Sequence, residues 1–186
     1  ASRSQAELIV MGTHGRSGWD RMKLGSTART VVREAPCPVL TLREVVARDS
    51  FRYHPKVCLD QILVATDFSS CARAALHYAA RLSTQCKAKM CVVHAADEGI
   101  AKQLGQRKLA TITRELRRNG LEVETRSVSG DPVEVILSQA AQWQADMIAI
   151  GTNGRRGLSR LLLGSVAEAV LARSGSPVLI VREDER

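Results

Sequence analysis

Aromatic residues are scarce in this chain, making up 3% of its 186 residues. A core with so few aromatic rings must be built from Val, Ile, Leu and Ala, which suits parallel strands buried between helices. A groove for single-stranded nucleic acid usually places stacking aromatic rings between basic side chains. The scarcity therefore argues against nucleic acid as a partner.

Paired cysteines and long apolar runs are also missing. The five cysteines are odd in number, none forms a CxxC pair, and they are Cys37, Cys58, Cys71, Cys86 and Cys91. We therefore predict neither a disulfide framework nor a zinc site, and expect reduced thiols. Because no segment resembles a signal peptide or a membrane span, we expect a cytoplasmic protein without a membrane partner.

Basic residues exceed acidic ones, with 27 Lys and Arg against 19 Asp and Glu and a net charge of +8. A solvated basic surface is one interpretation of this excess. An anionic partner, such as a nucleotide, a nucleic acid or a membrane surface, is the other.

The chain contains an internal repeat. Residues 6–44 align without a gap with residues 145–183, and each residue of the first copy has its counterpart 139 positions later. Only the second copy follows a long stretch, residues 57–144, that can complete a domain. We therefore expect residues 1–44 to be the C-terminal part of a first module, 45–58 a linker, and 59–186 a complete module. The aligned positions include Gly12 with Gly151, Gly15 with Gly154, Gly25 with Gly164, and Ser26 with Ser165.

Strand and helix patterns alternate through the complete module. Short apolar runs predict strands at 61–66, 89–95, 121–128, 147–150 and 178–181. This alternation predicts an α/β fold, an open five-stranded parallel sheet with helices on both faces. The strand order 3-2-1-4-5 would place the first and fourth strands side by side, where such sheets bind ligands.

Several residues predict where the helices of this module begin, end and pack. Ser69 or Ser70 is expected to cap the first helix, and Asp131 before Pro132 is a strong helix start. For a helix over 100–119, Gly120 is expected just past its end. Its apolar residues Ile100, Leu104, Ile112 and Leu116 are expected to face inward.

The spacing Gly151-x2-Gly154-x9-Gly164-Ser165 follows a predicted strand and opens a helix. Glycines allow close backbone approach and positive φ, while a helix start directs free N–H groups at an anion. The Ser165 hydroxyl and the Arg155 charge add to this, which favours a phosphate site over glycines that only form a turn. The pattern is not a P-loop, since GK[ST] is absent. It is not the dinucleotide motif GxGxxG either.

This motif resembles the ATP-binding signature of the universal stress protein family. The stretches ILVATDFS at 62–69, VVHA at 92–95, GDP at 130–132 and PVLIVR at 177–182 are also similar to that family. The resemblance covers residues 6–44 and 61–183. It implies an adenine-nucleotide alpha-hydrolase-like fold, ATP as the ligand, and stress-linked regulation. A Mg²⁺ ion bound chiefly by phosphate oxygens and water is left open, because Asp67 is the one carboxylate expected near the phosphate loop.

The resemblance also implies roles for individual residues. Asp67 would lie near the nucleoside, and the alternative is a helix cap without a ligand. Ala65 and Thr66 would line the floor, and Ala95 would form an adenine wall at a position where the family often has valine. The phosphates would contact Gly151, Asn153, Gly154, Arg155, Gly164, Ser165 and Val166.

The first copy keeps only the phosphate half of this pattern. It has Gly12, His14, Gly15, Gly25 and Ser26 but lacks a first strand, so we expect an incomplete or weak site there. His14 matches Asn153 and is interpreted as a polar loop residue, because a general base needs a positioned partner. We assign no catalytic and no metal-binding residues.

Two kinds of function remain open. A regulatory ATP-binding module with at most slow hydrolysis is favoured, because 151–166 offers only Arg, Asn and Ser rather than a base or a metal-binding carboxylate. An ATPase or a phosphate or adenylyl transferase is the alternative, and a protein–protein module without nucleotide is another. The last strands, Pro38–Arg43 and Pro177–Arg182, are expected to pair with pseudo-two-fold symmetry or to form a homodimer.

Overall fold

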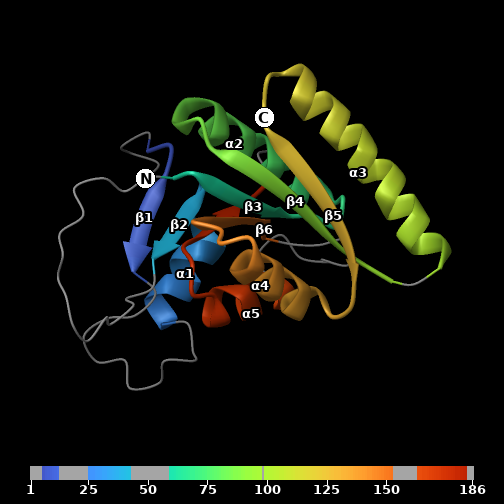
Figure 1. The fold of residues 1–186 in the computed structure, drawn as a ribbon. Helices are drawn as coiled ribbons and strands as arrows, with labels where there is room; N and C mark the ends of the chain where they lie inside the picture. The colour runs from blue at the N-terminus through green and yellow to red at the C-terminus, as the bar shows by residue number, and fades with distance from the viewer. Residues whose placement is uncertain (1–5, 13–24, 43–58, 98, 153–162, 184–186) are drawn as a thin grey trace, which may run out of the picture.

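The computed structural model of the protein describes residues 6–12, 25–42, 59–97, 99–152 and 163–183. The strands of these ranges form one seven-stranded sheet with the order β1-β2-β7-β6-β3-β4-β5 (Figure 1). The strands are β1 (Ile9–Gly12), β2 (Val39–Leu42), β3 (Gln61–Ala65), β4 (Lys89–Ala96), β5 (Val123–Ser129), β6 (Met147–Gly151) and β7 (Val178–Val181). The helices are α1 (Ser26–Glu34), α2 (Ser70–Cys86), α3 (Ile100–Arg118), α4 (Pro132–Gln142) and α5 (Ser165–Arg173).

The α/β class and the strand order predicted for the complete module are confirmed. Its five strands, β3 to β7, lie in the order 3-2-1-4-5, and every neighbouring pair among them is parallel. The partial copy forms the expected strand-helix-strand unit, β1-α1-β2. This unit extends the same sheet to seven strands, and β2 joins β7 antiparallel, so the whole sheet is mixed rather than parallel.

Helices cover both faces of the sheet. Side chains of α1, α4 and α5 pack into one apolar cluster on one face, and those of α2 and α3 pack into a second cluster on the other face (Figure 1). Strands β3 and β6 lie between the two clusters and are buried on both sides, which explains their continuous apolar runs. None of the helices in the described ranges has the length and apolar character needed to cross a bilayer.

Helix ends follow the expected capping chemistry. The Ser69 side chain accepts a hydrogen bond from the Ala72 backbone N–H, and Asp131 caps α4 from the position before Pro132. Gly120 has φ of 79° just past the end of α3, as predicted. The Leu121 N–H donates to Leu116 O, which closes the last turn of α3 through a Schellman-type pair of bonds.

The predicted inward face of α3 is wrong over its first half. Ile100 is 77% exposed and Leu104 is 51% exposed, whereas Leu116 is buried as expected and Ile112 is half-buried. The buried positions of this helix are Gly105, Leu109 and Leu116. Because a helix buries one stripe, seating Gly105 and Leu109 on the sheet turns Ile100 and Leu104 toward solvent.

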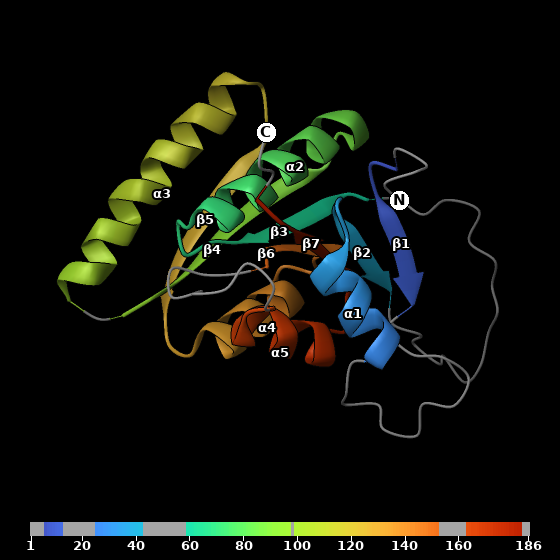
Figure 2. The same cartoon turned by 180° about the vertical axis from the view of Figure 1, so that it is seen from behind.

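The two copies meet along a pseudo-two-fold axis. Strand β2 runs antiparallel to β7 with Leu40 opposite Leu179, and these two residues are each other's counterparts in the repeat. Arg29 on α1 and Glu168 on α5 are also counterparts, and their side chains form an ion pair with an N–O distance of 2.8 Å. The two helices lie side by side in Figure 2. The expected pairing of the last strands is therefore seen within one chain.

Cysteine chemistry in the described residues agrees with the expectation of free thiols. Cys37, Cys71, Cys86 and Cys91 are all unpaired with one another. Cys91 lies in the middle of β4, and burial raises the pKa of its thiol to about 12. This thiol is therefore protonated and unreactive near neutral pH.

Candidate functional site

The candidate site lies where β3 and β6 end side by side. Strand β3 pairs with β4 on one edge and with β6 on the other, so the chain changes direction across the sheet at β3. This is the topological switch point, where open α/β sheets leave a crevice beyond their carboxyl ends. Thr66 and Asp67 follow β3, and Gly151 ends β6, so the two predicted halves of the site meet at one edge of the sheet.

The loop after β3 is held by its own side chains. Thr66 Oγ1 accepts a hydrogen bond from the Phe68 N–H at 3.0 Å, and Asp67 Oδ1 accepts one from the Ser69 N–H at 3.0 Å. Between them Phe68 adopts φ of 66°, a left-handed conformation that is strained for a bulky residue. Ser69, not Asp67, is the N-cap of α2. Asp67 instead fixes the turn that precedes the cap.

His94 on β4 anchors this loop from the neighbouring strand. Its ring is buried, and Nδ1 lies 2.8 Å from the Thr66 carbonyl oxygen, so a protonated Nδ1 donates to that oxygen. The Phe68 ring packs on it with centroids 4.5 Å apart. On its other side, a Cβ added at Gly105 would lie 2.7 Å from His94 Cδ2.

His94 is a buried core residue whose hydrogen-bond partner belongs to the candidate site. Sequence reasoning missed that its partner is the backbone of a predicted site residue, Thr66. The available signal was its place at the end of a strand, since the carboxyl ends of parallel neighbours lie at one edge.

Gly151 is required by packing within the protein. A Cβ at this position would lie 2.7 Å from the carbonyl carbon of Cys71 and 2.9 Å from the Ala72 backbone nitrogen. The first turn of α2 therefore rests directly on the end of β6. Gly151 is not among the residues with positive φ, so close packing rather than a left-handed conformation explains the glycine.

Helix α5 begins against the end of β6. The Gly164 N–H donates to Thr152 O at 2.7 Å, and this bond ties the start of α5 to the strand end. Gly164 is the N-cap with φ of −63° and ψ of 147°, and no side chain caps the helix. Any residue adopts these angles. What glycine provides at this position is the absence of a side chain before an uncapped helix start.

The remaining described residues of the predicted set lie around this edge. Ala65 is buried, Ala95 is half-buried, and both pack into the apolar cluster on the α4 and α5 face. Ser165 is exposed at the first position of α5, and Val166 is half-buried against the same cluster. Asn153, Gly154 and Arg155 lie outside the described residues, as do His14 and Gly15 of the first copy.

The first copy reproduces the helix start but lacks its surroundings. Gly25 is the N-cap of α1 with φ of −57° and ψ of 147°, again without a side-chain cap. Gly12 is exposed at the end of β1. Within the described ranges β1 pairs only with β2, and no strand occupies the place that β3 holds beside β6.

Comparison with known proteins agrees with this geometry. The model of the universal stress protein family matches residues 1–43 and 59–182. A universal stress protein of Methanocaldococcus jannaschii is 29% identical over 142 residues, covering 68% of this chain and 84% of the relative. One from Mycobacterium bovis is 27% identical over 193 residues, covering 97% of this chain and 63% of the relative. The chain belongs to the universal stress protein family.

Solved structures show the same fold. A universal stress protein from Archaeoglobus fulgidus superposes with a TM-score of 0.75 at 26% identity, covering 99% of this chain and 63% of that chain. A universal stress protein solved in complex with cAMP superposes with a TM-score of 0.55 at 28% identity, covering 66% of this chain and 95% of that chain. The chain thus spans 63% of the length of the M. bovis and A. fulgidus relatives.

Proposed function

We propose that this protein is an ATP-binding regulatory protein whose nucleotide site lies at the ends of β3 and β6. The observation that carries the proposal is the start of α5: an uncapped helix, opened by a residue without a side chain, is held on the strand end beside Asp67. A helix start of this kind binds anionic oxygens through its free N–H groups and its positive dipole end.

Different described residues would contact the phosphates and the adenosine part of the nucleotide. The first turn of α5, with Gly164, Ser165 and Val166, would receive the phosphates. Ala65 and Ala95, small residues on the α4 and α5 face, would leave room for an adenine ring, and Asp67 would accept from the ribose. Asn153, Gly154 and Arg155 complete the phosphate side of the proposal.

Bound ATP would add negative charge and bulk at this edge of the sheet. We assign no reactive group of the protein to act on it. The residues around it bind and orient the nucleotide, and hydrolysis is slow at most. His94 is bonded to Thr66 in this loop and lies against Gly105 of α3. A shift of Asp67 on nucleotide binding would therefore be transmitted to α3 through His94. Such a contact suits a regulatory module in the cytoplasm.

A cyclic nucleotide is the second candidate ligand. A relative of 28% identity was solved in complex with cAMP, which shares its adenine and ribose with ATP but has a single phosphate. A site that depends on several backbone contacts along the α5 start favours the triphosphate over one phosphate.

The first test is to denature freshly purified protein and identify any released small molecule by mass spectrometry. Calorimetric titration of ligand-free protein with ATP, ADP and cAMP should accompany it. We expect ATP or ADP to be released and to bind again, and Gly164→Val to lose both. Valine adopts the backbone angles of Gly164 without strain, so the variant should fold like the parent.

Three outcomes would contradict the proposal. Absence of released nucleotide together with absence of calorimetric binding would leave a protein–protein module. Tighter binding of cAMP than ATP would reassign the ligand. Rapid turnover of ATP, measured as phosphate release, would make the protein an enzyme.

A further inference from the structure

The basic charge of the protein is concentrated on one helix. Helix α3 carries six Lys or Arg and one Glu, a net charge of +5, while the whole chain has a net charge of +8. A basic excess spread over the surface would need no partner. An excess concentrated on one exposed helix raises the local positive potential and attracts an anionic one.

The outward face of α3 combines these charges with exposed apolar side chains. Ile100, Leu104, Arg107, Arg114 and Arg118 are all exposed. They recur three, four or seven residues apart, so they lie on one stripe, opposite the buried positions of the helix. The stripe therefore begins with two aliphatic residues and ends with arginines. Arginine is enriched at protein interfaces, and here it lies in line with two exposed aliphatic residues.

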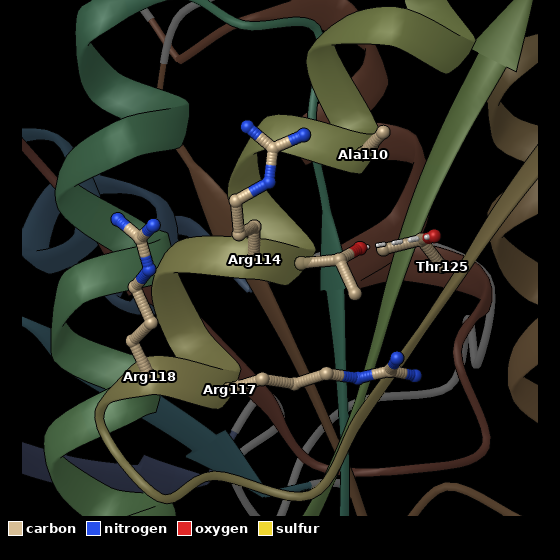
Figure 3. A pocket seen from close by; sticks show the side chains of 6 residues that line it. Ala110, Arg114, Arg117, Arg118 and Thr125 are labelled. Carbon is tan, nitrogen blue, oxygen red and sulfur yellow. Dashed lines mark hydrogen bonds between the residues drawn. The ribbon is translucent and has the colours of Figure 1, made fainter.

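A groove lies at the arginine end of this stripe, between the last turns of α3 and strand β5 (Figure 3). Its volume is about 700 Å³. One arginine is already engaged, since Arg117 Nη2 donates to Val123 O at 3.0 Å. The lining residues are Ala110, Thr113, Arg114, Arg117, Arg118 and Thr125.

The other two arginines of the groove are available to a ligand. Arg114 and Arg118 form no ion pair with any carboxylate of the described residues. Two carboxylates at the start of β5 have partners of their own, because Glu122 pairs with Lys89 and Glu124 pairs with Arg126. In Figure 3 the side chains of Arg114 and Arg118 extend from one side of α3, whereas Arg117 reaches from the other side toward β5.

This groove is separate from the candidate nucleotide site. Strand β5 begins at Val123, next to the groove, and the parallel strands run from there to the edge where Thr66 and Gly151 lie. The groove is at the amino ends of the strands, and the candidate site is at their carboxyl ends. A nucleotide at the α5 start does not account for the basic face of α3.

We propose that the stripe and groove of α3 bind an acidic, extended peptide segment of a partner protein. Arginine side chains bind carboxylates bidentately, so Arg114 and Arg118 would hold two acidic residues of the segment. Leu104 and Ile100 would pack on aliphatic residues further along it. From Leu104 to Arg118 the helix rises about 21 Å, a distance that roughly six to seven extended residues cover.

Two other anionic partners suit the face less well. Nucleic acid bound in this way would stack bases on aromatic rings, and neither the stripe nor the groove contains one. A membrane surface attracts any basic face, but this one has only two aliphatic side chains, Ile100 and Leu104, to insert into it. Paired arginines beside a shallow groove, with two aliphatic residues in line, favour a peptide.

The test uses the full chain and fluorescence anisotropy. The probe is a labelled peptide of about twelve residues with leucines at one end and glutamates at the other, offered in both chain directions. Arg114→Glu combined with Arg118→Glu should weaken binding roughly tenfold. The matched control, Arg73→Glu combined with Arg81→Glu, makes the same charge change on exposed arginines of α2 and should change it less than about twofold.

Two further variants guard against a misfolded or nonspecific result. Arg114→Lys with Arg118→Lys keeps the charge and should weaken binding by a smaller factor, because it removes the planar fork. Ile100→Ser with Leu104→Ser should weaken the leucine-bearing peptide but not a glutamate-only peptide. Circular dichroism melting checks that each variant folds.

Several results would overturn the proposal. Equal peptide binding by the α2 and α3 charge reversals would show only a net-charge effect. If the parent protein does not bind the peptide, the stripe and groove are not a site for it. Arginine-dependent binding of single-stranded RNA or of phosphatidylserine vesicles, with no peptide binding, would assign the face to that other partner.

Discussion

The two copies of the repeat fold alike locally and differ in their neighbours. Helices α1 and α5 each have nine residues, begin on an uncapped glycine with nearly the same φ and ψ, and end on an extended residue. Strand β6, however, lies between β7 and β3 and is buried throughout, whereas β1 leaves Val10 55% exposed. The motif therefore builds a helix start in both copies, whereas the proposed nucleotide site also needs the strand beside it.

Among these substitutions, the largest loss of stability is expected at the buried leucine between the two copies. Leu179 is fully buried, and its counterpart and strand partner Leu40 is half-buried. We expect Leu179→Ala to lower the free energy of unfolding by about 3 kcal/mol and Leu40→Ala by about 1 kcal/mol. Urea denaturation of both variants measures the difference. Equal losses would show that the two sides of the pseudo-two-fold axis are packed alike.

Counterpart glycines at the strand ends should respond differently to the same change. Gly151→Ala would force a Cβ against the backbone of α2, so we expect a loss of about 2 kcal/mol. Gly12→Ala, at an exposed position, should stay within about 0.5 kcal/mol of the parent. Thermal melting followed by circular dichroism compares them. A small effect at Gly151 would mean that α2 shifts easily.

Counterpart glycines at the helix starts sharpen the comparison for binding. Gly164→Val should weaken ATP binding at least about tenfold, a cost of about 1.4 kcal/mol, because a side chain would block the approach of phosphate to the α5 start. Gly25→Val should leave the affinity unchanged, since no strand of the described residues lies beside β1 as β3 lies beside β6. Calorimetry with both variants tests this. Loss in the Gly25 variant instead would place the nucleotide at α1.

The ion pair on the pseudo-two-fold axis should give the smallest effect. Arg29 and Glu168 are both partly exposed, so the pair contributes at most about 1 kcal/mol. Glu168→Arg should destabilise the chain by roughly that amount through repulsion, and adding Arg29→Glu should restore it. Salt weakens the effect because it screens exposed charges. Unfolding of the two single variants and the double variant in low and high salt closes the cycle.

The charges of Arg29 and Glu168 also distinguish the two arrangements expected from sequence, pairing of the last strands within one chain and pairing in a homodimer. Two identical copies meeting through β7 would bring Glu168 against Glu168, whereas the two copies of one chain bring Arg29 against Glu168. Pairing within the chain is therefore the electrostatically favoured arrangement.

Much of the fold could be predicted because local rules apply to it directly. Asp131 before Pro132, Ser69 before α2 and Gly120 after α3 set helix ends that depend only on nearby backbone groups. The repeat itself located the phosphate motif and the strands that pair at the axis. Buried parallel strands were visible as apolar runs.

Other features could not be predicted because they depend on which surfaces meet. The inward face of α3 was misassigned because Ile100 and Leu104 have helical spacing. The face that packs on the sheet is instead the one with Gly105, which lies against His94, and it leaves Ile100 and Leu104 exposed. The physical reason for glycine at 151 and 164 also depends on tertiary contacts. Gly151 accommodates the α2 backbone, and Gly164 has an ordinary conformation beside the end of β6.

The sequence by itself determined the strand and helix units, their caps and the family, because these follow from hydrophobic spacing, backbone hydrogen bonding and motif residues close along the chain. Only the tertiary structure decided that His94 braces Thr66, that Arg29 meets Glu168, and that the arginines of α3 line a groove with β5. These contacts join residues far apart in sequence. They are fixed by packing and sheet register, for which a single sequence contains no local signal.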